Sequence, residues 1–163
     1  MKKIIIYSAL ACIVFTSCKE QKQADGNLEK FQKNLVVAKQ FIAVFSTKDS
    51  TKEATLLADN FKWNGPAIGQ DSLPKEALLS NDKELMNGFN DITLTNAQYL
   101  PGVDPVTYKI DGNVRVYGTW VTKSASSGKT VKLRYYAVFE FNEAGKITAL
   151  EEYTNMEDLK KEY

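Results

Sequence analysis

The sequence predicts an α+β fold, in which helices come first along the chain and an antiparallel sheet follows. Apolar residues between positions 28 and 45 recur every three or four residues, as they do on one face of a helix. From residue 92 onward, segments rich in Thr, Val and aromatic residues alternate with turn signals, which is typical of a meander of strands. Because the helices precede the strands and do not alternate with them, the pattern favours α+β over a parallel α/β arrangement.

The first two helices are predicted from an apolar stripe and from a capping pattern. A long helix over residues 28–48 would bury one face, formed by Leu28, Phe31, Leu35, Ala38, Ile42 and Phe45. Ser50 followed by Glu53 fits a capping box, in which the hydroxyl and the carboxylate bond free N–H groups of the first turn. A short second helix is therefore expected over residues 51–58.

A short strand and a third helix are expected next. Residues 61–64 alternate like a strand and are followed by a Gly-Pro pair that stops it. Asp71 or Ser72 can cap a helix that carries Pro74 in its first turn. The buried side of this helix is expected to consist of Leu78, Leu79, Leu85, Met86 and Phe89.

The remaining strands and their register are predicted from the loops between them. Strands are expected at 92–100, 106–110, 114–122, 130–141 and 147–154. Centring the last two loops on their turns fixes which residues lie opposite one another. The expected pairs are Trp120–Leu133, Gly118–Tyr135, Val116–Ala137, Ala137–Glu151, Tyr135–Tyr153 and Leu133–Asn155.

One side of this predicted sheet is mainly apolar and carries the candidate site residues. Glu151 would lie there among apolar neighbours, where burial raises the pKa of a carboxyl group and lets it act as a catalytic acid or base near pH 7. Tyr135 and Tyr153 can donate hydrogen bonds to a developing oxyanion, and Asn155 can orient a ligand. A slip of one residue in the register would place Glu152 on this side instead of Glu151.

Composition excludes several classes of function. The chain of 163 residues has no histidine, which excludes Ser-His-Asp and Cys-His catalysis and every His-ligated metal site. The two cysteines, Cys12 and Cys18, both lie in the first segment, so the domain after it has neither thiol chemistry nor a disulfide. The formal net charge of +1 and the lack of basic runs give no basis for nucleic-acid binding. Because no nucleotide fingerprint or metal-ligand cluster is present either, no cofactor and no metal are expected.

The first segment has the pattern of an export signal. Lys2 and Lys3 precede an apolar stretch over residues 4–15, which is too short to span a bilayer and has the size of a signal-peptide core. The segment ending at Cys18 resembles the bacterial lipobox, in which small residues precede a cysteine that becomes lipidated. Cys12 is a rival position for the lipid, and an ordinary cleaved signal is a third interpretation.

The lipobox interpretation divides the chain into a signal peptide over 1–17, a flexible tether over 18–27 and a domain over 28–163. It predicts a lipid-anchored protein of the cell envelope, in the outer membrane of a Gram-negative bacterium. Whether the domain would face the periplasm or the cell surface stays open.

The order of the elements resembles the nuclear transport factor 2-like superfamily, also called SnoaL-like or ketosteroid isomerase-like. The resemblance covers about residues 30–160 and rests on the end of the first helix and on segments 59–63, 114–120, 135–141, 145–147 and 152–153. It implies a cone-shaped, curved antiparallel sheet wrapped on N-terminal helices, with an internal pocket. Enzymes of this superfamily often carry Asp or His where the last strand ends, whereas this sequence has Asn155 there and no histidine.

Three functions remain as alternatives. The first is a lipid-anchored binding module that holds a small, partly apolar ligand, with Trp63, Trp120, Tyr135, Tyr153 and Asn155 as ligand-binding residues. The second is an isomerase-like or dehydratase-like enzyme with Glu151 as its proton shuttle. The third is an envelope accessory protein that binds a partner, or a second copy of itself, through the outer sheet face. That face is expected to carry Arg134, Tyr136, Val138, Leu150 and Glu152.

Overall fold

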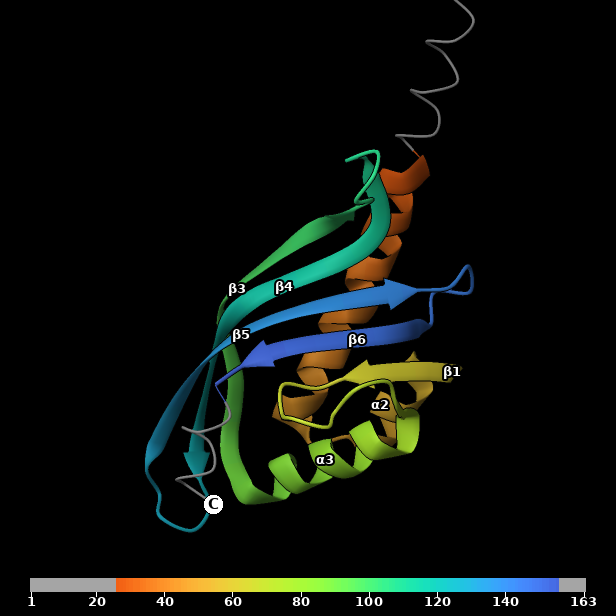
Figure 1. Cartoon of the computed structure of the whole chain (residues 1–163). Coiled ribbons are helices and arrows are strands. Elements are labelled where there is room, and N and C mark those ends of the chain that lie inside the picture. The colour runs from red at the N-terminus through yellow and green to blue at the C-terminus, as the bar shows by residue number, and fades with distance from the viewer. Residues whose placement is uncertain (1–25, 156–163) are drawn as a thin grey trace, which may run out of the picture.

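Residues 26–155 are described in a computed structural model of the chain, and they place three helices against one curved, open sheet (Figure 1). A helix over residues 26–47 is followed by α2 (Ser50–Leu56) and α3 (Lys75–Gly88). The strands are β1 (Leu57–Asn64), β2 (Leu73–Pro74), β3 (Phe89–Val103), β4 (Ile110–Ser124), β5 (Thr130–Phe141) and β6 (Ile147–Thr154). The α+β prediction is confirmed.

The strand order in the sheet is β2-β1-β6-β5-β4-β3. The last four strands form the antiparallel meander that the loops predicted. The sheet as a whole is mixed, because β1 pairs with β6 in the parallel direction. This pairing places the end of β1 beside the end of β6, at the edge of the interior that α3 covers (Figure 1).

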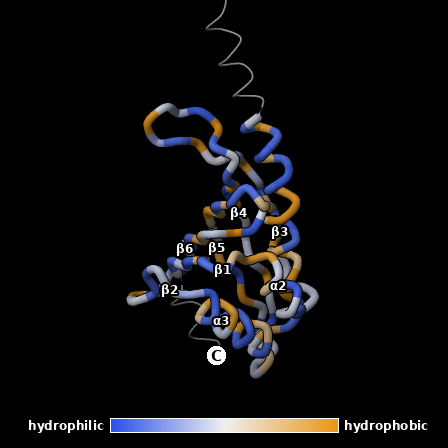
Figure 2. The backbone as a smooth tube through the Cα atoms, turned by 90° about the vertical axis from the view of Figure 1, so that its right-hand side faces the viewer, coloured by the Kyte–Doolittle hydropathy of each residue, from blue (hydrophilic) through white to orange (hydrophobic). Residues whose placement is uncertain are grey.

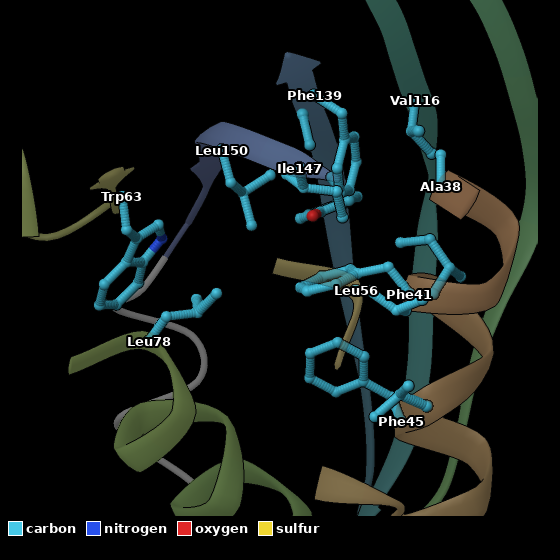
Figure 3. Packing of buried hydrophobic residues seen from close by; sticks show 14 of the residues in the cluster. Ala38, Phe41, Phe45, Leu56, Trp63, Leu78, Val116, Phe139, Ile147 and Leu150 are labelled. Atoms are coloured by element: carbon cyan, nitrogen blue, oxygen red, sulfur yellow. The ribbon is translucent and has the colours of Figure 1, made fainter. Parts of the chain in front are cut away.

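The core lies between the first helix and the concave side of the sheet. Most of the predicted apolar stripe of this helix is buried, but its first residue, Leu28, is 41% exposed and Leu35 is half-buried. Phe41, which was not part of the predicted stripe, is fully shielded from solvent. The ring of Phe41 packs edge-on against Phe139 of β5, with 5.4 Å between the ring centroids. Figure 3 shows Phe41 and Phe45 pointing from this helix into the interior, while Trp63 and Leu78 enter from β1 and α3.

The starts of the helices differ from the sequence-based expectation. Asp49, not Ser50, caps α2, since its side chain accepts a hydrogen bond of 2.9 Å from the N–H of Lys52. The capping-box prediction was therefore wrong, and Glu53 is buried instead of turning back to the helix end. Pro74 is the cap residue of α3 and makes no side-chain capping bond.

The first helix includes two residues that the sequence assigned to the end of the tether. Residues 26 and 27 are already helical, and Asn27 donates a hydrogen bond of 2.6 Å to the carbonyl of Ile110. Cys18 and the rest of the predicted export signal lie outside the described residues. Within residues 26–155, no helix is both long and apolar enough to cross a membrane.

The strand expected at 106–110 is instead a turn between two long strands. β3 runs on through Pro101 to Val103, and β4 begins at Ile110. The carboxylate of Asp104 accepts hydrogen bonds from the backbone N–H groups of Val106 and Thr107, which closes the loop over 104–109. An Asx-type turn of this kind competes with strand pairing, so the prediction failed at an aspartate.

The predicted register is confirmed for one strand pair and wrong for the next. Between β4 and β5 the pairs Trp120–Leu133, Gly118–Tyr135 and Val116–Ala137 are all present. Between β5 and β6 the register shifts by one residue at Glu140 and Phe141. The observed pairs are Ala137–Glu152, Phe139–Leu150, Tyr136–Tyr153 and Tyr135–Thr154.

This shift exchanges the two faces of β6. Glu152 lies opposite the fully buried Ala137 on the interior side, whereas Glu151 pairs with Val138 on the outer side. Leu150 is also buried in the core. The assignment of Glu151 to the interior, and of Leu150 and Glu152 to the outer face, was therefore wrong, because a side-chain period of two residues reverses every face at a slip of one.

Candidate functional site

A cavity of about 90 Å³ lies between α3, the end of the first helix and strands β1, β3, β4, β5 and β6. Its walls are mainly aromatic and aliphatic, from Phe45, Trp63, Pro66, Leu85, Phe89, Ile92, Trp120, Leu133 and Tyr135. The polar groups in its wall come from Gln70, Asn81, Asp82, Thr122, Glu152 and Thr154. No lysine or arginine of the described chain lines it. An apolar cavity with a few converging polar groups is the usual form of a small-molecule site.

Glu152 is held in the cavity wall by two hydrogen-bond donors. The hydroxyl of Tyr135 donates to its Oε1 over 2.7 Å, and the indole N–H of Trp63 donates to its Oε2 over 2.8 Å. Burial raises the pKa of Glu152, while the hydrogen bonds from Tyr135 and Trp63 oppose that shift. Because both donors favour the ionised form, Glu152 is the carboxyl group of the site that is best suited to carry a negative charge.

Asp82 and Glu53 form a second, more deeply buried pair of carboxyl groups. Asp82 of α3 is 2% exposed, and Glu53 of α2 is fully buried. The side-chain N–H of Asn81 donates to Asp82 Oδ1 over 3.0 Å. No donor from residues 26–155 reaches Asp82 Oδ2 or either carboxyl oxygen of Glu53. An ionised carboxylate has no hydrogen to donate. Two adjacent carboxyl groups can therefore form a hydrogen bond with each other only when one of them carries a proton.

Burial is the largest cause of the raised pKa values of both groups. Burial raises the pKa of Glu53 to about 7, despite a hydrogen bond with Asp82 that lowers it. Burial, the charge of Glu152 and hydrogen bonding with Glu53 together raise the pKa of Asp82 well above its usual range. These effects all favour the neutral form of Asp82, and its side chain lies in the wall of the cavity.

The site thus contains carboxyl groups with different protonation preferences. The two hydrogen bonds to Glu152 oppose the rise in its pKa, whereas burial, the charge of Glu152 and the contact with Glu53 all raise the pKa of Asp82. Two titratable groups whose surroundings separate their pKa values can serve as a base and an acid in one reaction.

The structure brings three of the predicted ligand-binding residues together at the cavity. Trp63, Trp120 and Tyr135 all line it. The ring of Trp120 packs against Tyr135, with centroids 5.6 Å apart. Asn155 is exposed just beyond β6 and does not line the cavity.

Glu151 and Tyr153 lie outside the cavity. The Tyr153 hydroxyl donates to Glu151 Oε1 over 2.5 Å, and Tyr153 is half-exposed. Both residues line a polar hollow beside the cavity, together with Asn64, Gly65, Pro66, Asp71, Glu152 and Thr154. The shifted register accounts for this position, and it makes Glu152, not Glu151, the carboxylate of the cavity.

Glu53 and Asp82 were missed by the sequence-based interpretation, although Asp82 gives a signal. It lies four residues after Leu78 and four before Met86, so it occupies a central position in the buried stripe of α3. Burying an acidic side chain in an apolar stripe destabilises the fold unless the group is paired, so such a residue is a candidate functional group. Glu53 gave no comparable signal, because its position also fits a helix-capping role.

The outer face of the sheet carries a row of stacked tyrosines. The ring of Tyr136 stacks on Tyr117 at 4.6 Å and on Tyr153 at 5.4 Å between centroids. Arg134 and Val138 also lie on this face, as expected.

Within residues 26–155, no group of three or more His, Cys, Asp or Glu side chains is arranged to hold a metal ion.

The family follows from a comparison with known domains. The family model for the SnoaL-like domain matches residues 38–150, which is well over half of the chain. The chain therefore belongs to the SnoaL-like domain family, and the superfamily resemblance is confirmed. No curated protein matches the chain.

Solved structures share the fold at low sequence identity. A candidate polyketide cyclase from Xanthomonas campestris is 15% identical with a TM-score of 0.66, over 82% of this chain and 98% of that chain. A candidate isomerase from Bacillus subtilis is 19% identical with a TM-score of 0.62, over 82% and 94%. The epoxide hydrolase/cyclase-like enzyme SalBIII, associated with pyran ring formation in the polyether salinomycin, is 18% identical with a TM-score of 0.63, over 78% and 94%. These similarities establish the fold alone.

Proposed function

We propose that the cavity binds a small, uncharged, largely apolar carbonyl compound and moves a proton on it. The observation that carries the proposal is the pair of unlike carboxyl groups in one apolar wall. Glu152 accepts hydrogen bonds from two donors, and one oxygen of the buried Asp82 has no hydrogen-bond partner in residues 26–155. The absence of a lysine or arginine from the described lining favours an uncharged ligand over an anionic one.

The chemistry follows from these two roles. Glu152 would remove a proton from the carbon next to the carbonyl group, while neutral Asp82 would donate a hydrogen bond or its proton to the carbonyl oxygen. The product is an enol. If the ligand also has a carbon–carbon double bond beyond the deprotonated carbon, this enol is conjugated, so Glu152 can return its proton to the far carbon of that double bond while Asp82 regains its proton from the enol oxygen, which gives an isomer. Aromatic walls keep water away from the reacting groups, which strengthens both interactions. The solved structures with this fold include a candidate cyclase and a candidate isomerase, which supports such a role for this chain.

The two tryptophans of the chain provide built-in reporters for ligand binding, because Trp63 and Trp120 both line the cavity. We expect butanone to shift both indole N–H signals in a nitrogen–proton correlation spectrum. The similarly sized anion butyrate should shift neither, because the cavity offers it two carboxyl groups and no cation. A spectrum in which neither compound, or only butyrate, shifts the indole signals would contradict the proposed ligand class.

We also propose that this domain is held in the cell envelope by a lipid on Cys18. The support is the sequence pattern of a short positive start, an apolar stretch and small residues before the cysteine. Two acyl chains on one cysteine are enough for stable membrane attachment. The outer membrane of a Gram-negative bacterium is the proposed location.

Replacement of Cys18 by serine is expected to move the protein from the membrane fraction to the soluble fraction. The reason is that serine has no thiol to carry the lipid, and the described residues contain no spanning helix that could replace it. Fractionation of cells and incorporation of labelled palmitate measure the effect. Cys12→Ser is the matched control and should leave both readouts unchanged. Loss of palmitate in Cys12→Ser, but not in Cys18→Ser, would assign the lipid to Cys12.

A further inference from the structure

We propose that the loop over residues 104–109, between β3 and β4, is a second contact with the lipid bilayer. This inference rests on the lipid anchor at Cys18 proposed above. The loop would touch the membrane surface beside the anchored start of the domain and so fix how the domain stands on the bilayer. The cavity would then open towards the aqueous side.

The first observation is that the loop exposes two large apolar side chains. Val106 is 81% exposed and Tyr108 is 80% exposed, so neither contributes much to the core. Tyr108 has a φ of 57°, in the left-handed region that disfavours bulky residues. Tyr108 therefore contributes little packing energy to the fold, and its backbone conformation is strained. Both facts indicate that this side chain serves a contact with something outside the domain.

The second observation is that the loop is closed by its own hydrogen bonds. The N–H of Asp104 donates to the carbonyl of Lys109, and the N–H of Tyr108 donates to the carbonyl of Asp104, both over 2.9 Å. The Asp104 carboxylate also accepts a hydrogen bond of 2.8 Å from the hydroxyl of Thr107. The apolar side chains are therefore presented on an ordered turn, which lowers the entropic cost of docking them on a surface.

The third observation is that this loop lies beside the first described residues of the chain. Asn27 donates to the carbonyl of Ile110 over 2.6 Å, and Asn34 donates to the carbonyl of Gly112 over 2.9 Å. Figures 1 and 2 show the β3–β4 loop and the start of the first helix at the same end of the molecule. The loop and the point where the chain leaves towards Cys18 thus belong to one surface.

The length of chain between anchor and domain limits how far the membrane can be. Eight peptide steps separate Cys18 from Gly26, and even fully extended they reach at most about 29 Å. A tyrosine and a valine held within that distance of a bilayer match the preference of aromatic side chains for the membrane interface. The acidic Asp104 and the basic Lys109 balance each other, so we expect an apolar contact that does not depend on anionic lipid.

The contact would also orient the functional site. Phe45, in the cavity wall, lies near the far end of the helix that begins beside the loop. At 1.5 Å per residue, the helix from Asn27 to Phe45 spans about 27 Å. With the β3–β4 loop on the membrane, the cavity would be held away from the lipid and would take its ligand from the aqueous phase.

The test uses the full-length chain, processed and lipidated in cells and reconstituted into phosphatidylcholine vesicles. Val106→Cys supplies a thiol for an environment-sensitive fluorophore, and Ile68→Cys is the matched control on an exposed loop near the cavity. We expect the label at position 106 to show blue-shifted emission and several-fold weaker quenching by aqueous iodide than the label at position 68. High salt should not abolish the difference.

A second variant tests orientation without a label in the loop. In the Val106→Ser/Tyr108→Ser double variant, energy transfer from the label at position 68 to a lipid-bound acceptor should increase, because the domain would tilt freely. Equal quenching at positions 106 and 68 on vesicle-bound protein would overturn the membrane contact alone. A wild-type chain that fails to float with the vesicles would overturn the anchor and the contact together, whereas the butanone experiment would remain unaffected.

Discussion

Replacement of Glu152 by glutamine is expected to reduce proton transfer by about 10²–10⁴-fold, the range that a positioned acid or base contributes. Glutamine keeps the size of the side chain but cannot accept a proton. The measurement is uptake of deuterium into butanone in deuterated water, followed by mass spectrometry, because the exchange needs only removal and return of a proton next to the carbonyl group. Wild-type protein should accelerate this exchange above the buffer rate.

Asp82→Asn should lower the same rate by a smaller factor. An asparagine amide can still donate a hydrogen bond to a carbonyl oxygen, but it cannot transfer a proton. The indole signals of Trp63 and Trp120 report whether each variant keeps the fold of the cavity.

Two further variants make the assignment to Glu152 specific. Glu151→Gln changes the adjacent carboxylate, which hydrogen-bonds Tyr153 outside the cavity, and should leave the exchange rate close to that of the wild type. Glu140→Gln, on the exposed side of β5, controls for the loss of one negative charge. If Glu151→Gln abolished exchange and Glu152→Gln did not, Glu151 would be the proton-transferring residue, as the sequence-based interpretation had it. If the wild-type protein bound butanone but did not accelerate deuterium exchange, the proton-transfer proposal would be wrong and only the ligand-binding function would remain.

The sequence was sufficient for the fold class and for three aromatic residues of the cavity wall. The apolar stripe of the first helix, the meander and the β4–β5 register all follow from periodicity and loop length. The positions of Trp63, Trp120 and Tyr135 at the cavity were predicted correctly, because large aromatic side chains on the concave apolar face of a sheet point into the interior.

The position of Glu152 could not be predicted because the β5–β6 register depends on a local irregularity. The shift occurs between Glu140 and Phe141, just before the turn. Neither residue is a glycine or a proline, so the local sequence carries no signal for a bulge. Centring the loop gave a pairing that was off by one residue, and that single step exchanged Glu151 for Glu152. A bulge is decided by the packing of both strands and not by the local sequence.

The buried acidic pair was missed for a different reason. Patterns of burial are inferred from apolar residues, and acidic residues are assigned to solvent by default. Glu53 and Asp82 are buried against each other from two different helices, α2 and α3. Their proximity is a tertiary feature, and no spacing along the chain encodes it.

The same acidic pair predicts that the protein loses stability as the pH rises from about 4.5 to about 7. Burial raises the pKa of Glu53 from 4.5 to about 7 in the folded protein, so the folded state keeps a proton that the unfolded state releases. Because the folded state then binds more protons, the free energy of unfolding falls with increasing pH across this window. The raised pKa of Glu53 alone corresponds to about 3 kcal/mol, and the raised pKa of Asp82 acts in the same direction.

Urea unfolding at several pH values between 4.5 and 7 measures this slope. Glu53→Gln should flatten it, because glutamine does not titrate yet can still donate a hydrogen bond to Asp82. Glu143→Gln is the matched control: Glu143 is exposed and its hydrogen bond with Lys30 lowers its pKa, so its removal should leave the downward slope in place. A wild-type protein that becomes more stable between pH 4.5 and 7 would show that Glu53 and Asp82 are ionised in the folded state. Asp82 would then be unable to act as the neutral acid, because the proton that it must donate would already be lost at pH 7.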